Sequence, residues 1–272
     1  GGAFVEEGNI VKFPAYLVEE CIRTAPSVLT LAGRDPNYDY QTAQGKVAFC
    51  NFGEGVNIID PYTREYRRTT KKDIENISKV ADALDIFPVA YRSVASQDKP
   101  GATMALHNFE GMINNTAKHI FCGADGEANA RKMIDMAAYV VGGKEELRKR
   151  PIISFNLCPT SPLQLNPTAS DVIVAAAEAG VPVNIISMAL SGATGPVTLA
   201  GTLVTHNAEV LAAITLSQLT SKGAPVLYSS STTLMDMKNL TTPVGSPELG
   251  IIGNAVGQLS RFYRLPCLVA GG

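Results

Sequence analysis

The 272-residue sequence has no tryptophan, only three histidines and no excess of either charge, its formal net charge being −2. The charge balance argues against nucleic acid as a general partner, because phosphate binding needs a basic surface. No run of 18 apolar residues occurs, so we predict no membrane span. The five cysteines include no Cys-x-x-Cys pair, which is typical of reduced thiols in a cytoplasmic protein.

The amino terminus lacks two further features. The opening stretch GGAFVEEGNIVKF has neither the basic nor the apolar region of a signal peptide. It also has no initiator methionine, so we expect that the true N-terminus is missing from this chain.

Apolar residues make up 46% of the chain, which is enough for a sizeable core. Residues 14–26 have a helical pattern with proline in the first turn and another proline beyond the end. Residues 46–60 are rich in β-formers around Gly53 and Gly55 and predict a hairpin. Residues 69–85 predict an amphipathic helix that begins at a threonine cap.

From residue 86 onward, apolar strands alternate with helices, which predicts a parallel sheet covered by helices. Four of the strands open with proline, a residue tolerated at the first position of a strand because no ladder hydrogen bond is lost there. The expected strands are IFPVAYRS from Ile86, AKHIFCG from Ala117, PIISFNLCP from Pro151, PVNIISMALSG from Pro182, PVLYSSSTT from Pro225 and PCLVAGG from Pro266.

No Gly-x-Gly-x-x-Gly motif follows any of these strands, so a dinucleotide-binding fold lacks its fingerprint. Repeated β/α units fit a (β/α)8 TIM barrel better. A barrel needs eight strands, and this chain supplies about six. We therefore predict an α/β fold in which residues 1–68 form an N-terminal α+β extension, with a helix and a β-hairpin, and residues 69–272 form an incomplete barrel.

Catalysis in such barrels occupies the carboxyl ends of the strands. These ends are consistently small and polar here, and long loops follow three of them. The alternative is that small polar residues simply end buried strands. The residues expected to line a substrate site are Asn156, Ser187, Tyr228, Ser229, Ser230, Ser231, Gly271 and Gly272.

The usual catalytic and metal-binding patterns are weak. His119 and Cys122 are three residues apart on one strand and therefore point to opposite faces, so we predict no metal site. His206 and Glu209 share a helix face and form either an acid–base pair or, as we favour, a helix-packing pair. Cys158 has no neighbouring base in the sequence and is interpreted as a small buried thiol.

Four segments around the strand ends carry a more specific signal. They are LCPTSPLQL (Leu157–Leu165), SMALSGATGPVTLAGTLVTHNAEVL (Ser187–Leu211), YSSSTTLMD (Tyr228–Asp236) and PVGSPELGIIGNAVGQL (Pro243–Leu259). These segments closely resemble the trimethylamine:corrinoid methyltransferase family. The resemblance continues more loosely upstream through GRDPNYD (Gly33–Asp39) and NNTAKHI (Asn114–Ile120).

The resemblance implies a barrel that moves a methyl group from trimethylamine to the cobalt of a cognate corrinoid protein, feeding methanogenesis or one-carbon metabolism. The corrinoid (cobalamin) is presented by that partner, so no cofactor is bound directly. Members with trimethylamine activity carry pyrrolysine, encoded by UAG, at the end of the sixth strand. We thus expect pyrrolysine, and the catalytic residue, directly after Gly272. We also expect the full-length protein to form a homo-oligomer.

Two alternatives stay open. Other branches of the family have an ordinary residue at the pyrrolysine position and demethylate quaternary amines such as glycine betaine. A methylammonium group favours an acidic and aromatic surround, for which Tyr91, Tyr228 and a few phenylalanines are the aromatic candidates. Alternatively, the chain is an inactive fragment of the barrel.

Overall fold

The computed structural model describes residues 2–6, 9–43 and 45–271 of the chain. By its internal contacts the chain divides into two compact units. Unit 1 comprises Gly1–Leu29, Leu157–Glu178 and Pro182–Gly272, and unit 2 comprises Thr30–Asn156 and Ala179–Val181. Each unit is described by itself.

Unit 2 is built on three neighbouring parallel strands in the order β7-β8-β9. In their register, Tyr91 of β7 is paired with Phe121 of β8, and Gly123 at the end of β8 is paired with Asn156 of β9. Almost every residue of these strands is buried, as expected where helices cover a parallel sheet. The strands are β7 (Val89–Tyr91), β8 (His119–Gly123) and β9 (Ile153–Leu157), and the helices are α2 (Lys71–Ala83), α3 (Met104–Ile113), α4 (Gly126–Val141) and α5 (Lys144–Lys149).

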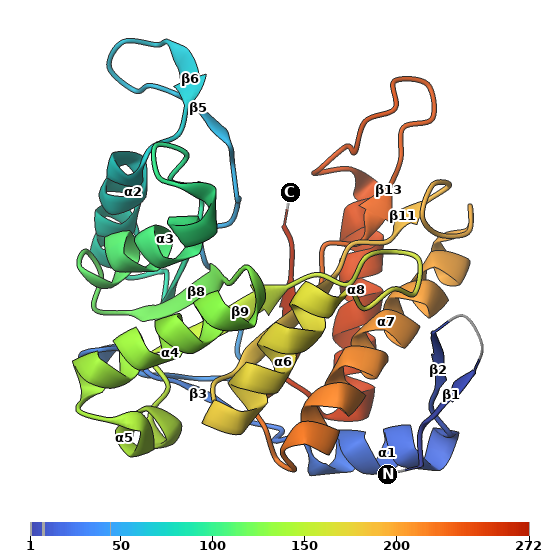
Figure 1. The fold of residues 1–272 in the computed structure, drawn as a ribbon. Helices are drawn as coiled ribbons and strands as arrows, with labels where there is room; N and C mark the ends of the chain where they lie inside the picture. Colours follow the sequence, from blue (N-terminus) through green and yellow to red (C-terminus); the bar gives the residue numbers. More distant parts are fainter. Residues whose placement is uncertain (1, 7–8, 44, 272) are drawn as a thin grey trace. The chain divides into compact units, whose positions relative to one another are not determined.

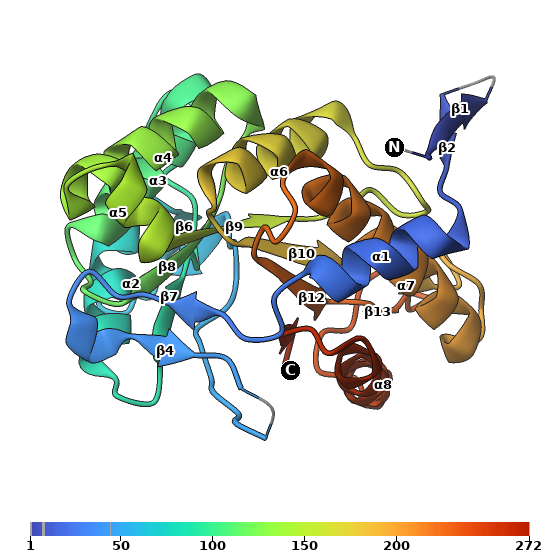
Figure 2. The same ribbon diagram turned by 90° about the horizontal axis from the view of Figure 1, so that it is seen from below.

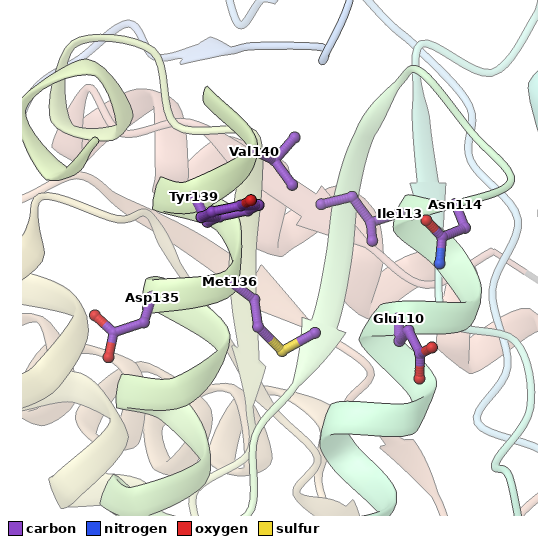
Figure 3. A pocket seen from close by; sticks show the side chains of 7 residues that line it. All are labelled: Glu110, Ile113, Asn114, Asp135, Met136, Tyr139 and Val140. Atoms are coloured by element: carbon purple, nitrogen blue, oxygen red, sulfur yellow. The ribbon is translucent and has the colours of Figure 1, made fainter. Parts of the chain in front are cut away.

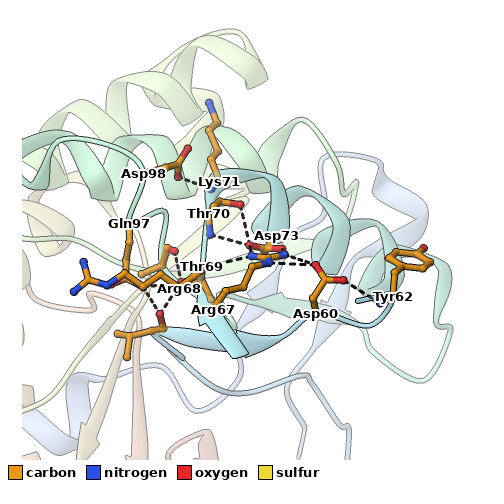
Figure 4. Close-up of polar contacts among 12 residues, drawn as sticks. Asp60, Tyr62, Arg67, Arg68, Thr69, Thr70, Lys71, Asp73, Gln97 and Asp98 are labelled. Carbon is orange, nitrogen blue, oxygen red and sulfur yellow. Dashed lines mark hydrogen bonds and ion pairs between the residues drawn. The ribbon is translucent and has the colours of Figure 1, made fainter. Parts of the chain in front are cut away.

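A β-hairpin precedes α2 and is tied to the first turn of that helix (Figure 4). Strands β5 (Asn57–Ile59) and β6 (Tyr66–Arg68) form the hairpin. The Arg67 guanidinium donates to the Asp73 carboxylate at 2.8 Å and to Asp60 at 2.9 Å. These bonds fix the β5–β6 hairpin to α2. The remaining short elements of unit 2 are β3 (Thr30–Leu31), β4 (Tyr40–Gln41) and the 3₁₀ helices η1 (Pro36–Tyr38) and η2 (Gly101–Thr103).

Unit 1 contains three more parallel strands, in the order β10-β12-β14. Helix α7 packs on β10 and β12, α8 packs on β12 and β14, and α1 lies outside against α7 (Figures 1 and 2). The elements are β1 (Phe4–Glu6), β2 (Ile10–Lys12), α1 (Ala15–Thr24), α6 (Pro167–Ala179), β10 (Val183–Ser187), β11 (Leu190–Ser191), α7 (Leu199–Thr220), β12 (Val226–Ser230), β13 (Thr233–Leu234), α8 (Pro247–Tyr263) and β14 (Cys267–Val269).

Proline stands one or two residues before four of the parallel strands, and the carbonyls of two of these prolines accept hydrogen bonds from the neighbouring strand. The carbonyl of Pro225 accepts from the Val183 amide at 3.1 Å, and that of Pro266 accepts from the Tyr228 amide at 2.9 Å. Likewise, Pro151 accepts from the Ala32 amide at 3.2 Å. Because proline has no N–H, its place ahead of the strand loses no ladder bond, as the sequence predicted.

The predicted fold class is confirmed. Within the part of the chain that the structure describes, six parallel strands alternate with helices in the pattern of an incomplete TIM barrel, three strands in each unit. The two helices expected near the amino terminus are also confirmed, as α1 and α2, and Thr70 is the N-cap of α2.

Helix α7 is long and apolar enough to cross a membrane by length and composition, with 39% of its most apolar window buried. A core helix of a soluble protein has the same length and composition, and α7 packs in this manner against β10, β12, α1 and α8. The helix also buries His206 and Glu209 among its polar residues.

The hairpin expected over residues 46–60 is displaced in the structure. Its first strand begins only at Asn57, and the turn lies between β5 and β6 rather than at Gly53 and Gly55. Gly53 is required for a different reason: a Cβ at this position would lie 2.6 Å from the carbonyl oxygen of Ser93. The glycine thus allows a close approach of two backbones instead of a turn.

Candidate active site

The carboxyl ends of the strands in unit 1 are level with one another and lead into long loops. The register pairs Ser187 of β10 with Ser230 of β12, and Ser230 with Val269 of β14. Loops 158–166, 188–198 and 231–246 follow β9, β10 and β12. This is the end of the strands at which barrel enzymes place their catalytic groups.

A carboxylate is buried beneath these loops. The Glu209 side chain on α7 accepts hydrogen bonds from Ser187 Oγ at 2.6 Å, Ser161 Oγ at 2.9 Å and the Leu163 amide at 2.9 Å. Glu209 is only 3% exposed, and among the described residues no cationic side chain forms an ion pair with it. Hydrogen bonds to the charged form offset the loss of hydration that a buried carboxylate suffers.

His206 lies one helical turn before Glu209 and is fully buried. Its Nδ1 is 3.2 Å from Thr232 Oγ1, whose hydroxyl donates to the carbonyl of Ser187 at 3.2 Å. Because the Thr232 proton is used there, His206 donates from Nδ1, which leaves a lone pair on Nε2. Nε2 has no hydrogen-bond partner among the described residues. Burial lowers the pKa of His206 to about 4, so the ring is neutral at pH 7.

His206 and Glu209 therefore share a helix face, but their hydrogen bonds go to different partners. Glu209 holds loop 158–166 and the end of β10, whereas His206 contacts Thr232, the second residue after β12, and packs edge-on against Tyr228 at 5.4 Å between ring centroids. Both residues are buried, but among the described residues no hydrogen bond joins them and His206 Nε2 has no partner, so they do not form the satisfied packing pair that we favoured from the sequence.

The structure brings the predicted serines together, but the hydroxyls of Ser187, Ser229 and Ser230 form hydrogen bonds to other residues of the protein. Ser229 Oγ donates to Asn184 Oδ1 at 2.5 Å, and Ser230 Oγ accepts from the Thr232 amide at 3.0 Å. Ser187, Ser229 and Ser230 are all buried, while Ser231 is partly exposed. Gly271 is exposed after β14, and Gly272 lies outside the described residues.

Tyr228 is fully buried in unit 1 and forms part of a short polar chain. Its hydroxyl donates to Asn207 Oδ1 at 2.8 Å, and Asn207 Nδ2 donates to the Tyr263 hydroxyl at 3.0 Å. Burial raises the pKa of the Tyr228 phenol. Tyr228 therefore connects β12 to α7 through Asn207 and to α8 through the ring of Tyr263, and its side chain is buried inside the unit.

The carboxyl ends of the strands in unit 2 carry a different set of groups. Asn156, at the end of β9, is 8% exposed and is paired in the sheet with Gly123. Tyr91 at the end of β7 is buried and lies 5.1 Å from the Phe52 ring. The next residue, Arg92, forms an ion pair with Glu54 at 2.7 Å. Glu54 is thus a charged residue at the strand ends that the sequence analysis did not single out. The sequence feature that could have drawn attention to it is its position between two glycines, Gly53 and Gly55.

A shallow pocket of about 430 Å³ lies elsewhere in unit 2, between α3 and α4 (Figure 3). Its two carboxylates are already paired, Glu110 with Lys71 at 2.5 Å and Asp135 with Lys144 at 2.8 Å. The pocket lies at the carboxyl end of α3, and the helices of β/α units run antiparallel to their strands. It therefore lies toward the amino ends of the strands, away from the catalytic face of a barrel.

Two other residues that the sequence raised behave as structural groups. His119 is fully buried, with Nδ1 3.1 Å from the Ala32 carbonyl and Nε2 2.7 Å from Ser154 Oγ. Burial lowers the pKa of His119 to about 4 and raises that of the buried Cys122 to about 12. Cys158 corrects our expectation, because it is exposed at the start of loop 158–166 rather than buried.

The fold and the strand ends define an α/β protein of the TIM-barrel class, with polar groups gathered at the carboxyl ends of its parallel strands. The chain belongs to the trimethylamine methyltransferase (MTTB) family, whose model matches residues 1–272.

The chain is 57% identical over 273 residues to the trimethylamine methyltransferase MttB of Desulfitobacterium hafniense, covering 100% of this chain and 55% of that protein. It is 46% identical over 275 residues to MttB1 of Methanosarcina mazei, covering 98% of this chain and 55% of that protein. A glycine betaine methyltransferase from D. hafniense is 34% identical over 267 residues, covering 98% of this chain and 56% of that protein. The chain thus spans about half the length of the curated relatives it matches.

Proposed function

We propose that the full-length protein transfers a methyl group from trimethylamine to the cobalt of a corrinoid carried by a separate protein. The observation that carries this proposal is the 57% identity, along the whole chain, to a protein named trimethylamine methyltransferase. The incomplete barrel and the polar groups at its strand ends support the same conclusion, because they supply the framework on which barrel enzymes build a reaction chamber.

The chemistry sets requirements that the site can meet. When the C–N bond breaks, its electron pair stays on nitrogen, so the amine must be positively charged beforehand if it is to leave as neutral dimethylamine. The corrinoid of the partner supplies the cobalt nucleophile that accepts the methyl group. The task of this chain is to hold the ammonium group in line with that nucleophile, and positioning of this kind lowers the barrier by several kcal/mol.

In unit 1, buried side chains at the carboxyl ends of the strands can hold the substrate-facing loops in fixed positions. Glu209 places a negative charge beneath the loops, which favours a cation above them, and its hydrogen bonds fix loop 158–166. Ser231 and Gly271 are accessible at the level where β12 and β14 end. Within unit 1, these are the predicted positions that stay accessible, and we assign a supporting role to the buried Ser187, Ser229 and Ser230.

We further propose that pyrrolysine follows Gly272 directly. The support for this proposal is the match to the trimethylamine methyltransferase family, together with the position of Gly271 two residues after the end of β14. We also propose that the protein is a cytoplasmic homo-oligomer acting in methanogenesis or one-carbon metabolism. Mass spectrometry of the natural protein tests the first point, and a standard amino acid after Gly272 would contradict it.

The decisive assay combines the full-length protein, its reduced corrinoid protein and trimethylamine. We expect the absorbance of the methylated corrinoid to appear and dimethylamine to be released in equal amount. The second candidate substrate is glycine betaine, which is favoured by the 34% identity to a glycine betaine methyltransferase. Methylation with glycine betaine but not with trimethylamine would replace the first proposal by the second, and methylation with neither would indicate an inactive protein.

A further inference from the structure

We propose that Glu54 is the carboxylate that binds the N–H of the trimethylammonium ion, and that it makes the site prefer a protonated tertiary amine to a quaternary one. This inference rests on the proposed function. It concerns the segment Asn51–Gly55, with the sequence NFGEG, which we call the strap. Neither the family match nor the names of the relatives assign a role to this segment.

The strap is bound to the carboxyl end of β7. The Asn51 side chain accepts from the Tyr91 amide at 3.0 Å and donates to the Tyr91 carbonyl at 2.5 Å, so it pairs with the strand as a neighbouring backbone would. The Gly55 amide donates to the Ser93 carbonyl at 2.7 Å, and the Ala95 amide donates to the Gly55 carbonyl at 3.1 Å. The strap therefore lies where a barrel places its substrate.

The backbone holds Glu54 in a conformation that side-chain-bearing residues rarely adopt. Its φ is +74°, in the left-handed region. Both neighbours of Glu54 are held against the segment after β7, Gly53 by its close approach to the Ser93 carbonyl and Gly55 by its bridge to Val94. Uncommon backbone conformations of non-glycine residues cluster at functional sites, where the surrounding structure enforces them.

The Glu54 side chain is both fixed and accessible. Arg92 Nη2 donates to Glu54 Oε1 at 2.7 Å, and the Arg92 side chain is only 13% exposed, whereas that of Glu54 is 42% exposed. The arginine thus lies beneath the carboxylate and the carboxylate faces outward. Gly123 lies beside the pair: a Cβ on this residue would be in ordinary van der Waals contact with Arg92 Nη2 at 3.7 Å and with Glu54 Oε1 at 3.8 Å.

Arg92 does not cancel the attraction of Glu54 for a cation on its outer side. An ammonium nitrogen about 4 Å from the carboxylate, on the side away from Arg92, is roughly 7 Å from the guanidinium, so the attraction exceeds the repulsion. The strap also presents an aromatic surface, since Phe52 is 43% exposed and packs on Tyr91. A carboxylate with a nearby aromatic face is the surround that methylated ammonium groups favour.

The chemical distinction follows from the hydrogen on nitrogen. An alkylamine such as trimethylamine is protonated at neutral pH and carries one N–H, which can donate to a carboxylate. A tetramethylammonium ion has the same charge and a similar surface but no N–H. Glu54 therefore adds a charge-assisted hydrogen bond for the tertiary amine alone, while both ions share the Coulomb attraction and the contact with the ring.

The test is calorimetric titration of the full-length protein with trimethylammonium and with tetramethylammonium chloride, without the corrinoid protein. We expect Glu54→Gln to weaken trimethylammonium binding about tenfold or more, the effect of losing a hydrogen bond to a charged group. Tetramethylammonium binding should weaken several times less. Glu54→Asp, which keeps the charge, should retain part of the preference for trimethylammonium.

The matched control is Glu146→Gln, which removes an exposed carboxylate paired with Lys149 at 2.8 Å on α5. It should leave both affinities unchanged, and thermal melts of every variant check the fold. Equal losses for the two ions, or no loss for either, would overturn the assignment even if methyl transfer from trimethylamine is observed. A wild-type protein that binds neither ion would overturn it as well. Methyl transfer is measured separately, so failure of the subsite and failure of the proposed reaction are distinguishable.

Discussion

Ser187 donates a 2.6 Å hydrogen bond to the carboxylate of Glu209, and this bond joins the end of a parallel strand to the middle of the helix that covers it. The same carboxylate holds Ser161 and the Leu163 amide of the preceding rim loop. A single buried side chain thus fixes two of the segments that surround the carboxyl ends of the strands in unit 1.

The first prediction concerns this carboxylate. Glu209→Ala leaves the buried Ser187 hydroxyl, the partly buried Ser161 hydroxyl and the Leu163 amide without their acceptor, so we expect it to lower the free energy of unfolding by about 2–4 kcal/mol. Loop 158–166 should also become more sensitive to proteolysis. Urea denaturation and limited proteolysis measure the two effects. Glu19→Gln, an exposed position on α1, is the control, and an equal loss of stability in both variants would contradict the role of Glu209.

The second prediction concerns Gly53. An added methyl group meets the Ser93 carbonyl oxygen at 2.6 Å, so Gly53→Ala must displace the strap or the segment after β7. We expect a loss of about 1–3 kcal/mol in the free energy of unfolding. Gly101→Ala serves as the control, because a Cβ there meets nothing within 4 Å. Unchanged stability of the Gly53 variant would show that the close approach is not kept in solution.

The third prediction concerns acid stability. Hydrogen bonding to Arg67, the largest cause, lowers the pKa of Asp73 to about 2 from 3.8. The resulting stabilisation is present above pH 4 and is lost as the pH falls from about 4 to 2, because the unfolded state binds the proton first. Asp73→Asn should therefore flatten this part of the stability curve. Asp171→Asn, at an exposed position of α6, should keep it.

The fourth prediction concerns the two buried histidines. Burial lowers the pKa of both His119 and His206 to about 4, whereas an unfolded histidine titrates at 6.5. Between these values the unfolded state binds more protons, so stability should fall as the pH drops from about 7 to 4. His206→Gln should remove part of that slope, while His107→Gln, at a partly exposed position of α3, should not. Equal slopes in wild type and His206→Gln would contradict the burial of the ring.

The β/α part of the fold could be predicted well from the sequence, because the features that mark each strand lie within the strand or directly before it. Buried parallel strands are continuous apolar runs, and the prolines before them mark where four begin. The hairpin was misplaced because glycines among β-formers usually indicate a turn, whereas Gly53 serves a contact with Ser93, forty residues away. No local pattern encodes such a contact.

The candidate site was predicted only at the level of which strand ends carry polar residues. The serines are where the sequence placed them, but whether a hydroxyl faces a chamber or a neighbouring strand depends on partners such as Asn184 and Glu209, which are distant in sequence. The burial of Glu209 likewise depends on three donors from two separate segments. Glu54 was missed because its partner Arg92 lies beyond the hairpin and α2.

The prolines ahead of the strands have a consequence for how this scaffold can be altered. The connections into β10 and β14 are only three residues long, Gly180–Pro182 and Arg264–Pro266, and each ends in proline, whereas the segments leaving β9, β10 and β12 run to nine residues or more before the next helix. Sequence change can therefore accumulate on one side of the sheet without disturbing strand register. A library should therefore vary only exposed positions of these loops, such as Met188, Val197 and residues 237–241. The buried Ser191, Thr232 and Thr233 and the helix caps Thr198 and Ser246 should be kept. Insertions before the prolines would disrupt the strands themselves.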